Sequence, residues 1–239
     1  MRKKRGYSRE TTTKLLRDYK LFAIACEGAE REPQYFNTFE YASTRVKVDV
    51  IKDSSDDADG ASHNKSSPTW VLDRAVKYIE SQGLSEEDQL YFVVDKDRWS
   101  REQLNILAEY CNRHSNWNLV ISNPCFEVWL YFHFRNNIEA STSTTCKHFK
   151  SEIASFEKGG YHPYTFIPNL LNAIDNAKSA DKNPTHYFSE FKETKVYQLA
   201  EALIKTIGIN DFNKFVNEVI PRLIQLNIKK ARVSKKANT

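Results

Sequence analysis

Three acidic side chains follow two short apolar runs in the first half of the chain. Glu27 comes directly after 21–26, LFAIAC, and Asp95 and Asp97 follow 90–94, LYFVV. Side chains two residues apart at the end of a strand point to the same side, so the two aspartates would present their carboxylates together. Such like charges repel unless a cation lies between them, and carboxylate oxygens suit Mg²⁺ or Mn²⁺. The spacing therefore predicts a divalent-metal site.

A fourth acid, Glu127, follows the next apolar run. It lies in the first turn of a helix that we predict to begin at Pro124, after NLVI at 118–121. Each acid also has a structural explanation: a DxD at a strand end often caps a loop, Glu27 can pair with a lysine, and Glu127 can complement its helix dipole. The conjunction of these acids behind three apolar runs favours the metal site.

Two basic residues and a glycine accompany the acids. Lys96 and Arg98 alternate with the aspartates, where they either form salt bridges or contact a substrate phosphate. Gly28 follows Glu27, and the lack of a side chain there would let the backbone approach a phosphate closely. We expect Lys96 or Arg98 to offset charge on the substrate.

The elements that must position these residues alternate between strands and helices. We predict helices after Pro33, from Ser67-Pro68 to Ile79, over 100–113, and from Pro124. The strands that we predict are 21–26, 46–51, 90–94 and 118–121. This alternation predicts an α/β fold with right-handed crossovers and a largely parallel sheet. Ligands bind outside the carboxyl ends of such strands, so we expect the four acids to meet at one edge.

The pattern changes after about residue 138. Residues 140–165 are mixed and turn-rich, and Pro221 should kink or interrupt the last helix. Beyond 165 we predict helical segments near 166–180, 192–207 and 211–227. We expect four parts: a basic segment 1–20, an α/β core 21–138, a mostly helical part 139–228 and a basic tail 229–239.

Charge is unevenly distributed along the chain. Residues 1–20 hold eight Lys/Arg and two acids, and 221–239 hold six Lys/Arg and no acid. Because the whole chain has a net charge of +4, the middle has a net charge of −8. Basic ends can attract a polyanion such as nucleic acid, and we expect them to bind the substrate backbone. Alternatively, they are disordered, solubilising ends.

Several classes of protein are excluded by composition. No run approaches the ~20 apolar residues of a membrane span, and the basic N-terminus lacks the apolar stretch of a signal peptide. We expect a soluble, cytoplasmic protein. Four cysteines do not form a disulfide framework in a chain of 239 residues, and their spacing from His114 and His148 matches no zinc module. The polar loop 52–67 lacks the ligands of a calcium loop.

Three segments resemble signatures of the RloB-like family, a Toprim-related group. IACEGAEREPQYF resembles the pattern CEG-x-x-x-EP-x-YF, VVDKDRW resembles V-x-D-x-D, and SNPCFEVWLYFHF resembles SNP-x-FE-x-W-x-x-x-HF. Asn183-Pro184 and Thr194-x-Val196-Tyr197-x-Leu199 are similar to a weaker last motif, although the intervening THYFSEFKE is longer than expected. The resemblance covers about residues 21–206.

The resemblance implies a Toprim fold, Rossmann-like, with a mostly helical C-terminal part. By its pattern Glu27 acts as general acid/base or ligand, and Asp95 and Asp97 bind Mg²⁺. Glu32 and Glu127 match further acids that complete a two-metal site in Toprim nucleases. His133 lies six residues after Glu127, about 600° around a helix, so we interpret it as a core or substrate-side residue.

The resemblance also implies a function. It indicates a metal-dependent nuclease acting on nucleic-acid phosphodiesters, DNA or RNA, in restriction–modification and anti-phage loci, often beside an ATPase. One alternative is a non-catalytic Toprim-like module that binds a partner ATPase or nucleic acid. Another is nucleotidyl transfer, as in primases, which would need a template-binding partner domain. The retained acids favour the nuclease, since a degenerate site has no reason to keep a repulsive cluster.

Overall fold

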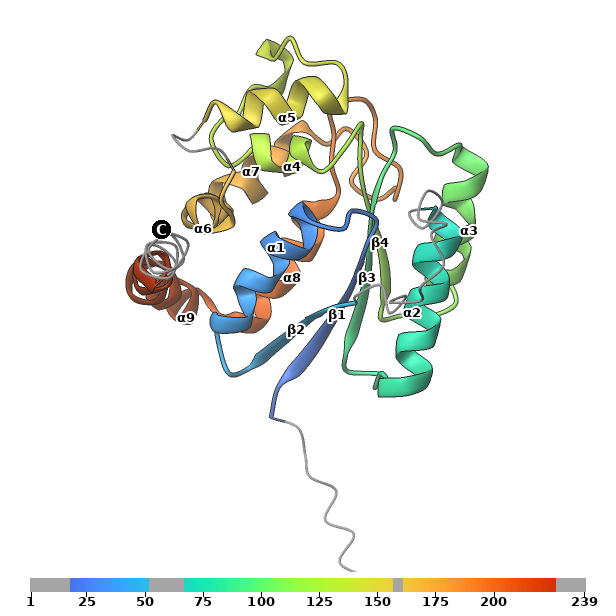
Figure 1. Cartoon of the computed structure of the whole chain (residues 1–239). Helices are drawn as coiled ribbons and strands as arrows, with labels where there is room; N and C mark the ends of the chain where they lie inside the picture. Colours follow the sequence, from blue (N-terminus) through green and yellow to red (C-terminus); the bar gives the residue numbers. More distant parts are fainter. Residues whose placement is uncertain (1–17, 52–66, 157–160, 227–239) are drawn as a thin grey trace, which may run out of the picture.

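A computed structural model describes residues 18–51, 67–156 and 161–226 (Figure 1). The predicted polar loop 52–67, except its last residue, and nearly all of the two basic ends lie outside the described residues. None of the helices in the described part is long and apolar enough to cross a membrane.

The centre of the molecule is a four-stranded parallel sheet. Its strands are β1 (Lys20–Cys26), β2 (Val46–Val50), β3 (Gln89–Asp95) and β4 (Trp117–Ser122). They are ordered β2-β1-β3-β4, and every pair is parallel. The predicted α/β class is thereby confirmed, and each predicted strand is present within one or two residues. Between β1 and β3 the strand order reverses, and ligands bind at such a switch point.

Three helices connect the strands: α1 (Arg31–Asn37), α2 (Pro68–Gln82) and α3 (Arg101–Cys111). The Ser67 side chain accepts a hydrogen bond from Trp70 N, so α2 begins where the Ser-Pro pair predicted. Ser100 and Gln103 form a capping box at the start of α3, so this helix begins where the sequence predicted it.

The two faces of the sheet pack against different sets of helices. Along β1, Phe22, Ile24 and Cys26 point into a core shared with α1 and the C-terminal helices. Ala23 and Ala25 point into the second core, beneath α2 and α3. This alternation of side chains across a strand places helices on both faces (Figure 1).

The C-terminal half is mostly helical and packs on the α1 face. Its helices share one continuous apolar core with β1 and β2, and both α1 and α8 contact β2. They are α4 (Glu127–Tyr131), α5 (Cys146–Ala154), α6 (Pro163–Phe166), α7 (Leu170–Ala180), α8 (Val196–Ile207) and α9 (Ile209–Lys214), with short 3-10 turns at Thr38–Tyr41, Ile138–Ala140 and Ile167–Asn169.

Some boundaries differ from the predictions. The turn-rich interpretation of 140–165 missed α5, which begins after a Thr145 cap. The helix expected from residue 192 begins at Val196, because the preceding residues pair with β4. Likewise α4 begins at Glu127, three residues after Pro124. The interruption expected at Pro221 takes the form of a π-helix at Phe215–Val219, after which the helix continues to residue 226.

Candidate active site

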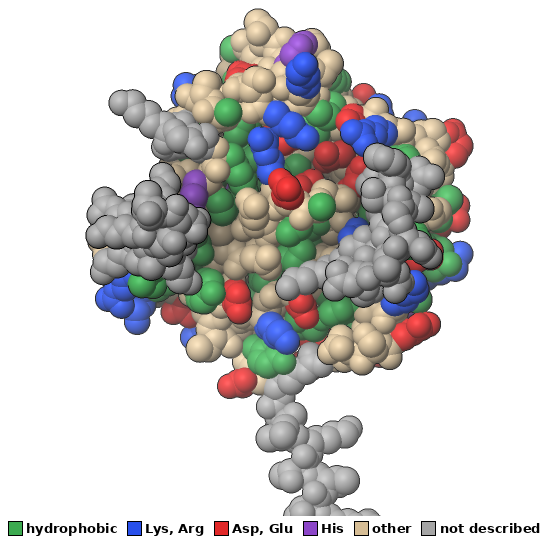
Figure 2. All heavy atoms as spheres, viewed as in Figure 1, with side chains coloured by type: hydrophobic (Ala, Val, Ile, Leu, Met, Phe, Trp, Pro, Cys, Tyr) green, Lys and Arg blue, Asp and Glu red, His purple; other side chains and the backbone are tan. Residues whose placement is uncertain are grey.

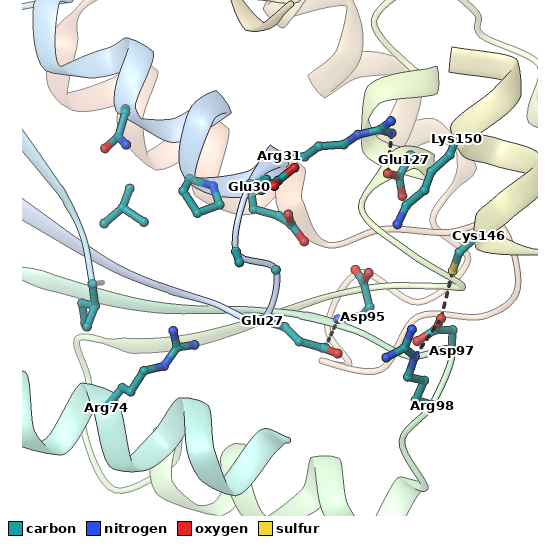
Figure 3. A pocket seen from close by; sticks show the side chains of 17 residues that line it. Glu27, Glu30, Arg31, Arg74, Asp95, Asp97, Arg98, Glu127, Cys146 and Lys150 are labelled. Atoms are coloured by element: carbon teal, nitrogen blue, oxygen red, sulfur yellow. Dashed lines mark hydrogen bonds and ion pairs between the residues drawn. The ribbon is translucent and has the colours of Figure 1, made fainter. Parts of the chain in front are cut away.

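The carboxyl ends of β1 and β3 bring the first predicted acids together. Glu27 N donates to Val93 O at 2.9 Å, which continues the pairing of the two strands by one residue. Asp95 N then donates to Glu27 Oε2 at 2.9 Å. The Glu27 carboxylate is therefore fixed against the end of β3, next to the DxD segment (Figure 3).

All five predicted acids line one cavity at this edge. The cavity measures about 810 Å³, within the range of pockets that hold small ligands. Glu32 is contributed by α1 and Glu127 by α4, and both are almost fully buried. The predicted placement at one sheet edge is what the structure shows: the cavity includes Glu27, Glu32, Asp95, Asp97 and Glu127.

The Glu27 carboxylate has both oxygens engaged. Trp99 Nε1 donates to Oε1 at 2.8 Å, and Asp95 N donates to Oε2. Burial raises the pKa of Glu27 to about 7, the two hydrogen bonds oppose that rise, and the charges of Asp97 and Glu32 add to it. A carboxyl with a pKa near 7 can exchange a proton at neutral pH.

Burial and mutual repulsion act on the neighbouring acids. Desolvation raises the pKa of Asp95 well above its usual range, and the charges of Glu32, Glu27 and Glu127 raise it further. The pKa of Glu32 is also raised, first by burial and then by the charge of Glu127. The cavity thus concentrates negative charge in a site that disfavours it.

Gly28 lines the cavity and also has a packing role that was not predicted. A Cβ at this position would collide with the carboxylate of Glu32. The glycine therefore makes room for an acid of the cavity, since any side chain there would displace Glu32.

Four cationic side chains also line the cavity, and only Arg98 was predicted. Arg31 Nη1 forms an ion pair with Glu127 Oε1 at 2.6 Å, and the Arg98 guanidinium lies 3.8 Å from Asp97. Lys150 on α5 and Arg74 on α2 complete the group. Figure 2 shows basic and acidic side chains side by side here, and Figure 3 shows Arg31 and Lys150 on the side of Glu127. Arg31 stands within the first motif, which was a usable signal, whereas Lys150 stands on an unpredicted helix.

Lys96 is not among the residues that line the cavity. Its Nζ lies 5.0 Å from the centre of the Phe188 ring instead. The reason is the strand geometry, which turns the residue between two aspartates to the opposite side. Asp97 also has a contact that was not predicted, because Cys146 Sγ donates to its Oδ2 at 3.2 Å.

His133 is a core residue. Its Nε2 lies 2.9 Å from Tyr35 Oη and its Nδ1 lies 3.1 Å from Trp129 O. Burial lowers the pKa of His133 to about 3, so the ring is neutral at physiological pH. Of the two interpretations made from the sequence, the buried position supports the core one.

The donor chemistry of the cavity fits a hard divalent cation. Carboxylates are the ligands that Mg²⁺ prefers, and a cation would relieve the repulsion that raises the pKa of Asp95 and Glu32. In the arrangement of the described residues, however, no three His, Cys, Asp or Glu side chains are placed as ligands of one ion. Trp99 and Cys146 already donate hydrogen bonds to Glu27 and Asp97, so a cation bound by these acids would share their oxygens with those donors.

A second charged cluster lies at the end of β4 and is fully buried. Lys195 Nζ lies 2.6 Å from both carboxylate oxygens of Asp181 and donates to Asn183 O at 2.7 Å. Tyr197 Oη donates to Asp181 Oδ2 at 2.8 Å, and Thr194 pairs with Ser122 of β4. The last, weaker sequence motif therefore has a structural role.

Comparison with known proteins identifies the family. The family model described as RloB-like protein matches residues 22–203, which is most of the chain and includes every acid of the cavity. There is no significant match among curated proteins and none among solved structures. Because the matched region runs from β1 into α8, this chain belongs to the RloB-like protein family.

Proposed function

We propose that the chain is a metal-dependent nuclease of the Toprim type that hydrolyses nucleic-acid phosphodiesters. The observation that carries this proposal is the convergence of the five predicted carboxylates, together with Glu30, in one cavity at the carboxyl edge of a parallel sheet. Burying like charges together destabilises a fold, so the arrangement favours a site that receives a cation over a purely structural role.

Asp95, Asp97, Glu32 and Glu127 are the residues that would hold Mg²⁺ or Mn²⁺. When bound, the metal would supply an activated water and stabilise charge on the phosphoryl oxygens. Glu127 is already neutralised by Arg31 at 2.6 Å, and Asp95 makes no side-chain hydrogen bond within the described residues. Asp95 is therefore the acid with the most to gain from a cation.

Glu27 is the proton-transfer group in this proposal. Trp99 and the backbone of Asp95 hold its two oxygens, which fixes the direction of the carboxylate. Its pKa of about 7 suits a group that accepts a proton from water and returns it to the leaving oxygen at neutral pH.

The cations of the cavity provide the contacts to the substrate backbone. Arg31, Lys150 and Arg98 line the same cavity as the acids, and the Arg98 side chain is 72% exposed. A polyanion approaching an acidic site needs such charges nearby, and guanidinium groups pair well with phosphate. They act in addition to the basic ends of the chain, which were predicted to bind the backbone.

The family resemblance extends the proposal to anti-phage defence, with an ATPase as partner. In that setting the partner or a phage component gates cleavage, so the isolated chain has low activity. We therefore test metal binding as well as cleavage. If the chain is instead a non-catalytic module, we expect neither metal binding nor cleavage.

The test compares wild type with Asp95→Asn, which keeps the shape of the side chain and removes its charge. Labelled DNA, RNA and tRNA are incubated with Mg²⁺ or Mn²⁺, alone and with the neighbouring ATPase, and Mn²⁺ binding is measured by calorimetry. We expect metal-dependent cleavage and Mn²⁺ binding in wild type, and loss of both in Asp95→Asn.

The matched control is Asp175→Asn, an exposed acid on α7 that does not line the cavity. It should leave both properties unchanged. Cleavage that persists in Asp95→Asn, or a wild-type protein that binds no Mn²⁺, would contradict the proposal.

A further inference from the structure

A short segment before α8 brings four aromatic rings to the end of β4. It comprises residues 186–191, with His186, Tyr187, Phe188 and Phe191, and belongs to the stretch between Pro184 and Thr194 that is longer than the family pattern. In Figure 1 it belongs to the orange chain that precedes α8. Tyr187 and Phe188 pack against the core beneath α2 and α3, so the segment lies on the Lys96 side of the DxD.

The segment is held by buried hydrogen bonds at its middle and just after its last residue. Ser189 Oγ donates to Ile121 O at 2.7 Å, and Asn123 Nδ2 donates to Ser189 O at 2.9 Å. Lys192, in a left-handed backbone conformation at φ 65°, donates through Nζ to Ser141 O at 2.7 Å. These bonds tie the aromatic segment to the strand whose end borders the cavity, so its position relative to the acids is determined by the core.

Cationic side chains surround these rings. Lys96 and Arg101 lie 5.0 and 4.9 Å from the centre of the Phe188 ring, and Lys192 Nζ lies 5.8 Å from that of Phe191. The acids Glu190 and Glu102 are also exposed in this region. Three cations therefore face the rings themselves. Arg98, which lines the cavity, lies between Lys96 and Arg101 in the sequence.

Phe191 has no structural explanation for its exposure. Its side chain is 46% exposed, although it follows a tightly anchored segment. Aromatic faces next to cations are the surface on which proteins bind unpaired bases, with stacking on the ring and the backbone near the charges. A duplex cannot use such a surface, because its bases are already stacked on one another.

We infer that residues 186–191, with Lys96 and Arg101, bind unpaired nucleotides of a nucleic-acid strand by stacking on Phe191. The inference rests on the proposed function and defines its substrate class as single-stranded or looped. Lys96, which the sequence assigned to the substrate, then contacts a phosphate that flanks the stacked base, outside the cavity of the acids.

The experiment measures binding without cleavage. Fluorescence anisotropy of labelled single-stranded and duplex oligonucleotides is recorded without metal on the full chain, in wild type and in Phe191→Ala, Phe191→Leu and Phe191→Tyr. We expect single-strand affinity to fall roughly tenfold in the Ala and Leu variants, the size that loss of one stacked base produces, and to be retained in Phe191→Tyr. Duplex binding should not change.

The matched control is Tyr41→Ala, an aromatic residue 51% exposed at a different surface, near β2 and α9. It should bind single strands as wild type does. Unchanged binding in Phe191→Ala overturns the inference while leaving the nuclease proposal intact. A Leu variant equal to wild type overturns stacking, because an apolar side chain without a ring would then bind the strand equally well. A wild-type protein that binds no nucleic acid overturns this inference and also the nuclease proposal.

Discussion

Two clusters of charged side chains lie at the carboxyl ends of the strands, and they are built in opposite ways. The side chains of Asp181 and Lys195 are both 0% exposed. The further hydrogen bonds of this ion pair are made with other groups of the protein. The cavity instead gathers six acids, the five predicted ones and Glu30, and burial together with mutual repulsion raises the pKa of Asp95 and Glu32. The two clusters therefore differ in how far the protein itself compensates their charge: the pair is fully compensated, and the acids of the cavity are not.

The largest effect is expected in the fully compensated pair. Lys195→Met leaves the Asp181 carboxylate buried without its counter-charge, so the free energy of unfolding should fall by about 3–5 kcal/mol. Urea unfolding measures this change. The control is Lys178→Met, which removes an exposed ion pair to Glu201 and should have little measurable effect. Equal effects of the two substitutions would mean that the buried pair has no special role.

The acids of the cavity should make the free energy of unfolding fall as pH rises. Acids that are stabilised by partners in the folded protein have the opposite effect. Burial raises the pKa of Glu27 to about 7, above its value in the unfolded chain, so the folded state binds the proton more tightly. Metal-free protein should therefore lose stability as pH rises from about 4.5 to about 7, by no more than about 3 kcal/mol.

Urea midpoints across that pH range test this prediction. Glu27→Gln removes the titrating group, so its stability should vary less over the same interval, whatever its absolute value. Added Mg²⁺ should reduce the loss of stability between pH 4.5 and pH 7, because it favours the charged acids. A wild-type curve that rises from pH 4.5 to 7 would show that the acids are stabilised by partners in the folded protein.

A smaller gain in stability is expected from Asp95→Asn without metal. The substitution removes one repelling charge from the cavity, so the melting temperature at pH 7.5 should rise by a few degrees, as about 1 kcal/mol produces in a domain of this length. The gain should vanish at a pH well below 3.8, where the carboxyl is protonated in both the folded and the unfolded chain. A lower melting temperature at pH 7.5 would mean that the charge of Asp95 is compensated in the folded protein instead.

The smallest effect concerns the counter-ion of Glu127. Arg31 neutralises this buried acid at 2.6 Å and so competes with any metal for it. Arg31→Met should tighten Mn²⁺ binding a few-fold in calorimetry, while weakening the affinity for single-stranded oligonucleotides. Arg113→Met, an exposed residue at the end of α3, is the control and should change neither. Weaker Mn²⁺ binding in Arg31→Met would mean that the guanidinium positions Glu127 for the metal.

Much of this architecture could be predicted from local sequence. Apolar runs of strand length, Ser-Pro and Ser-x-x-Gln caps, and the alternation of strands with helices are short-range signals. They predicted the parallel sheet and the starts of α2 and α3. Since parallel strands end at a common edge, the same signals brought Glu27, Asp95 and Glu127 to one place.

The tertiary structure decided which side of that edge each side chain faces and what surrounds it. Strand alternation accounts for Lys96, which turns away to Phe188, but only the packing of α1 and α5 brings Arg31 and Lys150 to the cavity. Asp181 and Lys195 are 14 residues apart and pair only because the chain between them folds back against β4. The sequence alone therefore could not predict which residues surround the acids, because long-range packing determines those contacts.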